Sequence, residues 1–198
     1  GYGLAVALSL ALTAAPAQGG SVTHVEGFTF HGDSAGDDFG FSVSGAGDVN
    51  GDGTPDLIVG AIGDVNGSAR VFSGLDGSEI HTFSGDNPSN NFGSSVSGVG
   101  DVDKDGFADL IVGAPPVNVG PSGSARLISG KSGDTLHTFV DARNNKFGSS
   151  VSGVGDVNDD GTPDLIVGDI SANNNIGSAT VFSGNTDTGN ELLFTVNG

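Results

Sequence analysis

The apolar residues of this chain fall in short runs that are separated by glycine, aspartate, serine and asparagine. Runs such as Leu57-Ile58-Val59 and Val71-Phe72 have the length of β-strands, and clusters of Gly, Asp and Asn between them are typical of tight turns. Beyond the first 20 residues, no segment has the periodicity of an amphipathic helix. The pattern therefore predicts an all-β chain of short strands.

The chain also contains an internal repeat. The sequence Phe-Gly-Ser-Ser-Val-Ser-Gly-Val-Gly-Asp-Val occurs identically at 92–102 and 147–157, with a close variant at 39–49, so the copies start 53 and 55 residues apart. Each copy is followed by an acidic loop, by Asp-Leu-Ile-Val-Gly, and then by further apolar segments. Four short strands in a unit of this size are typical of one blade of a β-propeller, which is a four-stranded antiparallel sheet.

We therefore expect an all-β fold, a β-propeller region with three full four-stranded antiparallel blades and one orphan N-terminal strand over residues 25–31. Each blade starts at a Phe whose ring is predicted to be buried between neighbouring blades. Three blades are too few to close a ring of four to eight, so we interpret the chain as a fragment of a larger propeller. The expected parts are a truncated secretory signal peptide (1–20), the orphan strand and linker (21–38), and blades at 39–91, 92–146 and 147–198.

Export is predicted from the N-terminus. Residues 4–15 form one apolar run, followed by Ala15-Pro16-Ala17. The run is too short to span a bilayer and matches the hydrophobic part of a signal peptide with an A-x-A cleavage site. We expect a secreted or cell-surface protein with no membrane span in the mature chain. An apolar N-terminal helix of the mature protein is the alternative.

The candidate chemistry lies in the acidic loops, which share the pattern Asp-x-(Asp/Asn)-x-Asp-Gly-x-x-Asp. Side-chain oxygens at positions 1, 3, 5 and 9 can converge on one point, the glycine at position 6 permits a sharp turn, and the carbonyl at position 7 can add a ligand. Hard oxygen ligands in this number favour Ca²⁺ over Mg²⁺. The predicted ligands are Asp48, Asn50, Asp52, Thr54 and Asp56; Asp101, Asp103, Asp105, Phe107 and Asp109; and Asp156, Asn158, Asp160, Thr162 and Asp164.

The alternative interpretation of these loops is an ordinary polar turn between strands. Three copies in register, each with at least three carboxylates, argue against it, because close carboxylates repel one another without a cation. The loops are not EF-hands, since position 12 is apolar and a strand follows. We predict about one structural Ca²⁺ per blade and three in this chain.

Composition narrows the class of partner. The chain has 24 acidic and 6 basic residues and a net charge of −18, and its basic residues are scattered. This balance disfavours nucleic acid, and we expect no nucleic-acid partner. Three bound Ca²⁺ would bring the charge to about −12. The absence of Cys excludes disulfides and thiol catalysis.

A family resemblance follows from these motifs. Phe-Gly at the start of each unit, the acidic loop, and Gly113-Ala114-Pro115 after the second strand resemble the FG-GAP repeats of integrin alpha-subunit β-propellers, over about residues 25–198. The third unit departs from the pattern with Gly168-Asp169-Ile170. The resemblance implies a seven-bladed propeller with calcium on its underside, binding partners on the opposite face, and closure of the ring by an N-terminal strand.

Sequence signals for an enzyme are weak, and we expect no catalytic activity. No Gly-x-Ser-x-Gly motif is present, and Gly130-Lys131-Ser132 is predicted to form a turn between the third and fourth strands. His81 and His137 share one repeat position, which favours an architectural role, and Arg70 and Arg126 share another that suits a surface or inter-blade ion pair.

The favoured function is an extracellular, calcium-stabilised β-propeller module that binds or adheres to an extracellular protein or glycan. The alternative is a non-catalytic propeller region of a larger secreted enzyme, and a third possibility is a spacer in a surface protein. Propellers serve many functions, so the fold alone does not decide among these.

Overall fold

The computed structural model describes residues 27–63, 65–117, 122–141, 146–172, 176–185 and 192–198. The chain divides into two units, Gly1–Phe30 and His31–Gly198. The predicted signal segment, 1–20, lies outside the described residues. In the first unit, the rings of Phe28 and Phe30 lie 6.2 Å apart. The fold that follows is that of the second unit.

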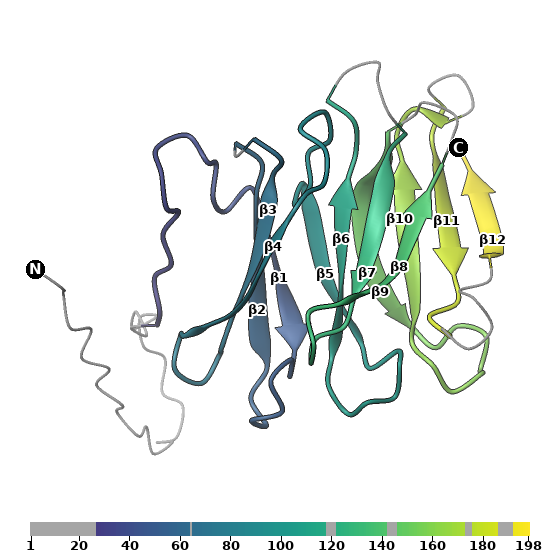
Figure 1. The fold of residues 1–198 in the computed structure, drawn as a ribbon. Helices are drawn as coiled ribbons and strands as arrows, with labels where there is room; N and C mark the ends of the chain where they lie inside the picture. Colours follow the sequence, from purple (N-terminus) through teal and green to yellow (C-terminus); the bar gives the residue numbers. More distant parts are fainter. Residues whose placement is uncertain (1–26, 64, 118–121, 142–145, 173–175, 186–191) are drawn as a thin grey trace, which may run out of the picture. The chain divides into compact units, whose positions relative to one another are not determined.

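The second unit consists of three antiparallel sheets of four strands each, with the strands of each sheet in sequence order (Figure 1). These sheets are the predicted blades, and the all-β propeller-blade fold is confirmed. The strands of blade 1 are β1 (Ser42–Gly47), β2 (Asp56–Ala61), β3 (Ser68–Phe72) and β4 (Glu79–Ser84). Those of blade 2 are β5 (Ser95–Gly100), β6 (Asp109–Ala114), β7 (Ser124–Ile128) and β8 (Thr135–Val140). Those of blade 3 are β9 (Phe147–Gly155), β10 (Asp164–Asp169), β11 (Ser178–Phe182) and β12 (Leu192–Asn197).

The three blades share one strand register. The first two strands of each blade pair so that equivalent valines face each other, as Val96 faces Val112 in blade 2. The register shifts near the end of each first strand, between Gly98 and Gly100 in blade 2. Such a bulge bends a strand and increases its twist. The repeated bulge therefore directs the chain into the acidic loop in the same way in every blade.

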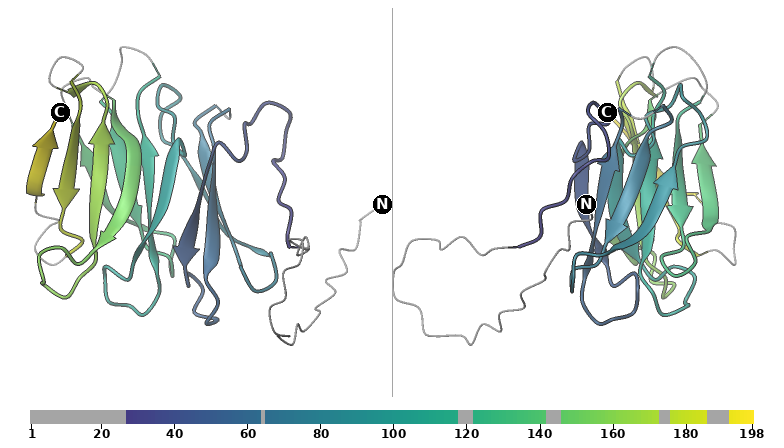
Figure 2. Two further views of the ribbon diagram at one scale, coloured as in Figure 1. Left: turned by 180° about the vertical axis from the view of Figure 1, so that it is seen from behind. Right: turned by 60° about the vertical axis from the view of Figure 1, so that its left-hand side comes forward.

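The core lies between successive blades, with the first strands β1, β5 and β9 neighbouring one another (Figures 1 and 2). Side chains alternate along a strand, so blade 2 contributes to both interfaces. Leu110 and Val112 of β6 belong to the cluster shared with blade 1, and Ile111 belongs to the cluster shared with blade 3. Burial on both faces explains why β6 is an uninterrupted apolar run rather than an alternating one.

The starting phenylalanines behave as predicted wherever a blade precedes them. Phe92 and Phe147 are buried in the two inter-blade clusters. Phe39, at the start of blade 1, is half-buried and packs edge-on against Phe72 at 6.1 Å. The difference follows from position, because no described blade packs against that side of blade 1.

The outer faces of blades 1 and 3 expose residues that are buried elsewhere. Val43 is 70% exposed in blade 1, whereas its equivalent Val96 is 6% exposed in blade 2. At the other end, Val196 is 57% exposed in blade 3, whereas Phe139, at the same register position of blade 2, is 4% exposed. The repeats thus carry the same apolar pattern whether or not a neighbouring blade covers it.

The shared arginine position forms the predicted ion pairs. Arg126 of blade 2 pairs with Asp86, donates to the carbonyl of Ser84 at 3.2 Å and lies over the Phe92 ring. Since Ser84 ends the last strand of blade 1, this pair joins two blades. Arg70 of blade 1 makes the equivalent contacts with Asp33 and with the carbonyl of His31, each at 3.3 Å, and a further pair with Glu79.

The orphan strand is not formed as predicted. Of the expected span 25–31, the described residues 27–31 are not in a strand. A strand requires a neighbour to pair with, and none of the described strands pairs with this segment. Residues at the end of this span and just after it nevertheless make the contacts of their counterparts in blade 1, because His31 and Asp33 contact Arg70 as Ser84 and Asp86 contact Arg126.

The departure of the third unit from the repeat pattern leaves its strands intact. Asp169 takes the place of the buried Ala61 and Ala114 and is itself buried at the end of β10. The amide and hydroxyl of Ser171 donate to Asp169 Oδ1 at 3.0 and 3.4 Å. These donors satisfy one oxygen of a carboxylate that stands where the other blades have a methyl group, and among the described residues its Oδ2 has no hydrogen-bond partner.

Glycines of the second strands allow the blades to approach closely, and they provide a matched test. A Cβ on Gly113 would lie 2.1 Å from the carbonyl oxygen of Gly148 in blade 3, whereas a Cβ on the equivalent Gly168 would meet only a Ser150 side-chain carbon at 3.4 Å. We expect Gly113→Ala to lower the free energy of unfolding by about 2–3 kcal/mol, because backbone must move, and Gly168→Ala by less than about 1 kcal/mol. Urea denaturation of both variants measures this. Equal losses would contradict the close packing of blades 2 and 3.

Candidate metal centre

The three acidic loops lie at one end of the blades, each between the first and second strands (Figure 1). The loops run from Asp48 to Asp56, from Asp101 to Asp109 and from Asp156 to Asp164. They are followed directly by the most buried strands of each blade. The core therefore holds both ends of each loop in place.

Inside each loop, side-chain carboxylates accept hydrogen bonds from the loop's own backbone. In blade 2, Asp101 accepts from the amides of Asp105 at 3.0 Å and Gly106 at 2.9 Å, and Asp105 accepts from the amide of Phe107 at 3.0 Å. The same bonds recur in blades 1 and 3. These bonds wrap the chain around its own carboxylates, as the spacing predicted.

Position 4 of each loop is in the left-handed region of backbone space. Gly51 takes this position in blade 1 with φ of 76°, but Lys104 and Asp159 take it in blades 2 and 3 with φ of 63° and 59°. Residues other than glycine adopt this conformation at a cost of about 1–2 kcal/mol. The sequence analysis missed this feature, because Lys and Asp give no sign of it.

The aspartate at position 9 is the most constrained residue of each loop. Asp109 is fully buried and accepts from the amide of Val102 at 2.8 Å and from the amide of Gly130 at 3.0 Å. Gly130 lies in the turn between β7 and β8, so one carboxylate joins the loop to a distant turn of the same blade. Asp56 and Asp164 make the equivalent bonds in their blades.

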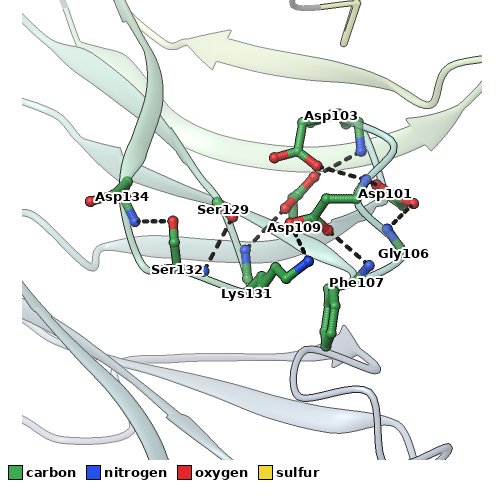
Figure 3. Close-up of polar contacts among 12 residues, drawn as sticks. Asp101, Asp103, Gly106, Phe107, Asp109, Ser129, Lys131, Ser132 and Asp134 are labelled. Atoms are coloured by element: carbon green, nitrogen blue, oxygen red, sulfur yellow. Dashed lines mark hydrogen bonds and ion pairs between the residues drawn. The ribbon is translucent and has the colours of Figure 1, made fainter.

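Three carboxylates converge in the loop of blade 2 (Figure 3). One oxygen from each of Asp101, Asp103 and Asp109 lies within 4.8 Å of the others. Asp105 is outside this group, and its Oδ2 lies 4.0 Å from the Lys131 ammonium. Among the described residues, this is the group of three acidic side chains that could share a metal ion.

The loops of blades 1 and 3 differ at position 3, where they have an asparagine. The Asn50 amide donates to Asp52 at 2.8 Å, and the Asn158 amide donates to Asp160 at 3.0 Å. These donations are the leading cause that holds the pKa of Asp52 and of Asp160 below its usual value. At position 3, the loops of blades 1 and 3 thus carry an amide that donates to the carboxylate at position 5, whereas the loop of blade 2 carries another carboxylate, Asp103.

Burial makes two carboxylates of the blade 2 loop, those of Asp103 and Asp109, costly to keep ionised. Burial raises the pKa of Asp109 to about 6, against the lowering effect of its backbone hydrogen bonds. Burial is also the leading cause that raises the pKa of Asp103, and the charges of Asp105 and Asp101 add to it. A bound cation would oppose both shifts, because it favours the ionised form.

Neighbouring loops also contact each other directly. The Ala108 amide of blade 2 donates to the carbonyl of Asp48 in blade 1 at 2.9 Å. The Phe107 ring lies so close to Gly51 that a Cβ there would be 2.6 Å from it. Blade 3 has Pro163 where blade 2 has Ala108, and proline has no amide hydrogen to donate to blade 2.

The chemistry of these residues fits a hard divalent cation. The predicted ligands are oxygen donors, and a carboxylate oxygen that accepts one hydrogen bond retains a second lone pair. The loops are ordered through their own hydrogen bonds, and the structure brings the predicted side chains of positions 1, 3 and 9 together in blade 2. Sequence reasoning missed the contributions of the turn after the third strand, where Ser73 and Ser183 donate to Asp52 and Asp160.

The two repeat histidines are held in packing contacts. His81 forms a hydrogen bond between its Nε2 and the carbonyl of Gly130 at 2.6 Å, and its ring lies 5.6 Å from that of Phe83. The rings of His137 and Phe139 are 4.6 Å apart. These contacts agree with the architectural role expected from the sequence.

Comparison with known proteins gives sequence relatives that include integrin alpha subunits. Residues 92–127 match the model of the FG-GAP repeat. The chain is 33% identical to integrin alpha-5 of Xenopus laevis over 71% of its length and 35% identical to human integrin alpha-IIb over 68%. It is 32% identical to integrin alpha-V of Gallus gallus over 71%. It spans about 15% of the length of these relatives.

Solved structures with a similar fold include two rhamnogalacturonan lyases. The lyase YesW matches with a TM-score of 0.50 at 14% identity, over 78% of this chain and 34% of that one. A rhamnogalacturonan lyase of Bacillus licheniformis matches with the same TM-score at 12% identity. At this identity, the likeness concerns the fold alone. In the part of this chain that the structure describes, no helix has the length and apolar character needed to cross a membrane.

The contribution of the buried aspartate to the stability of the fold can be measured without any metal. In chelator, we expect Asp109→Ala to lower the free energy of unfolding by about 3–5 kcal/mol, because it leaves two buried amides without an acceptor. Asp103→Ala is the matched control and should cost less than about 1 kcal/mol, since its carboxylate accepts one partly buried amide, that of Asp105. Urea denaturation at pH 7 compares them. Equal costs would contradict the structural role of position 9.

Proposed function

Because the chain is an FG-GAP repeat protein that resembles integrin alpha subunits, we propose that it is an extracellular β-propeller module whose acidic loops bind structural calcium. The observation that carries the proposal is the convergence of Asp101, Asp103 and Asp109 in a loop wrapped by its own backbone amides. The same hydrogen bonds in blades 1 and 3 support one ion per blade.

The ligands of each ion are the oxygens at positions 1, 3, 5, 7 and 9 of its loop, as the spacing predicts. Calcium supplies positive charge among carboxylates that otherwise repel one another. The Asp109 carboxylate holds Val102 and Gly130 in place, so an ion beside it would stabilise both the loop and the turn after the third strand. The role of the metal is therefore structural.

We assign the module to binding or adhesion, with an extracellular protein or glycan as its partner. Two observations support this: the similarity to integrin alpha subunits, and the strong negative charge, which disfavours nucleic acid. The expected contact surface is the end of the blades opposite the acidic loops, where the second strands end and the third strands begin. Secretion follows from the predicted signal segment.

Calcium should stabilise the fold measurably. Extracellular sites bind Ca²⁺ with Kd of about 10⁻⁴–10⁻³ M, so at ten times Kd three sites add about 4 kcal/mol. For a domain of this size, we expect chelation to lower the Tm by about 10 °C and Mg²⁺ to restore little of it. Thermal melts in calcium, in chelator and in magnesium measure the effect.

Two variants connect that effect to the loops. Asp105→Ala should reduce the calcium-dependent gain in Tm, because it removes a predicted ligand, whereas Lys104→Ala at the neighbouring position should not reduce it, because it removes no ligand. Superimposable melts of the wild type in all three conditions would mean that the loops are ordinary turns.

We expect no catalytic turnover by this chain itself. The packing contacts of His81 and His137 are those of structural residues, and the likeness to lyases concerns the fold alone. An assay with rhamnogalacturonan, followed by release of unsaturated products, should give no rate above that of buffer. A rate that His81→Ala or His137→Ala abolishes without unfolding the protein would overturn this expectation.

A further inference from the structure

The turn between the third and fourth strands differs among the blades at one position beside the acidic loop. The turn residue that follows Gly74, Gly130 or Gly184 is Leu75 in blade 1, Lys131 in blade 2 and Asn185 in blade 3. The preceding glycine donates to the position-9 aspartate in every blade. The side chain at this position is therefore carried at a fixed place next to the loop.

In blade 2, that side chain brings a positive charge to the carboxylates (Figure 3). Lys131 points toward the acidic loop, and its ammonium lies 4.0 Å from Asp105 Oδ2. The ammonium also lies 4.6 Å from the centre of the Phe107 ring. The Lys131 side chain is 52% exposed, and its contacts with Asp105 and Phe107 hold its ammonium beside the loop.

The added charge coincides with an added carboxylate. The loop of blade 2 has Asp103 at position 3, whereas the loops of blades 1 and 3 have Asn50 and Asn158. In those two loops, the asparagine amide donates to the carboxylate at position 5. In blade 2, position 3 offers no such donor, and Lys131 is the positive group that approaches the position-5 carboxylate instead.

We propose that Lys131 is an affinity-setting residue, a tethered cation that competes electrostatically with Ca²⁺ for the loop of blade 2. The inference rests on the proposed calcium binding and adds to it that one of the sites is weakened from within. Without calcium, the ammonium offsets the repulsion among the four aspartates of this loop. With calcium, the same ammonium repels the ion.

The expected size of the effect follows from charge and exposure. A unit charge and a divalent ion about 5 Å apart repel appreciably even at the dielectric constant of water, but an exposed lysine can move aside and salt screens it. We therefore expect removal of the charge to tighten the site by about three- to tenfold rather than by orders of magnitude.

The test is a calcium titration that reports each loop separately. The amides of Gly53, Gly106 and Gly161 each donate to the first aspartate of their own loop, at 2.8, 2.9 and 2.8 Å. Their backbone resonances in an NMR titration with calcium chloride therefore give one Kd for each loop. Lys131→Leu introduces the residue of blade 1 and retains an aliphatic side chain against Phe107.

We expect Lys131→Leu to lower the Kd reported by Gly106 by three- to tenfold and to leave those of Gly53 and Gly161 unchanged. Lys131→Arg keeps the charge and should keep the wild-type Kd. Leu75→Lys is the reverse experiment: Leu75 is 62% exposed and tolerates lysine, which should raise the Kd reported by Gly53 by a similar factor. Raising the salt from 0.1 to 1 M should shrink both differences.

The possible failures are distinguishable. If wild-type glycine resonances do not respond to calcium at all, the proposed calcium binding is wrong, and this inference with it. If they respond but Lys131→Leu leaves the Kd at Gly106 unchanged, only the role of Lys131 is wrong. An equal tightening in Lys131→Arg would also overturn it, because the effect would then come from packing rather than charge.

Discussion

One buried carboxylate in each blade fixes the relation between core, loop and turn. This carboxylate belongs to the first residue of the second strand, which is Asp56, Asp109 or Asp164. It accepts one hydrogen bond from a backbone amide at the start of its loop and one from a backbone amide in the turn after the third strand. An ionised group in such a place is stable only while its hydrogen bonds are complete. The acidic loop therefore has a structural role besides its predicted metal ligands, because its last residue connects the loop to the turn between the third and fourth strands.

The packing between blades imposes the second constraint. The backbone of one blade approaches that of the next so closely at Gly60 and Gly113 that a single methyl group would meet a carbonyl oxygen. This explains the glycine before the last residue of β2 and of β6. Contacts between blades thus depend on small residues in the second strands, whereas contacts within a blade depend on strand pairing. Local charge differences, such as Lys131 beside Asp105, can then vary without disturbing either set.

Much of this architecture could be predicted from the sequence, because the repeat places equivalent residues in equivalent environments. The four strands of each repeat and the burial of Phe92 and Phe147 followed from the repeat pattern. The prediction failed for residues 27–31, since a strand depends on a partner that a local pattern does not reveal. The left-handed Lys104 and the bond from Ala108 to Asp48 were also missed. Both arise from tertiary geometry, which residue type does not encode at these positions.

The exposed apolar faces of blades 1 and 3 have a consequence for how the protein comes apart. Each blade contacts only its immediate neighbours, so stability is shared along a row, as in other repeat proteins. Blade 2 is held from both sides, whereas each outer blade is held from one. In this chain by itself, fluctuations that open the sheets will therefore begin at blades 1 and 3, and amide hydrogens in β6 will exchange with solvent more slowly than those in β2 or β10.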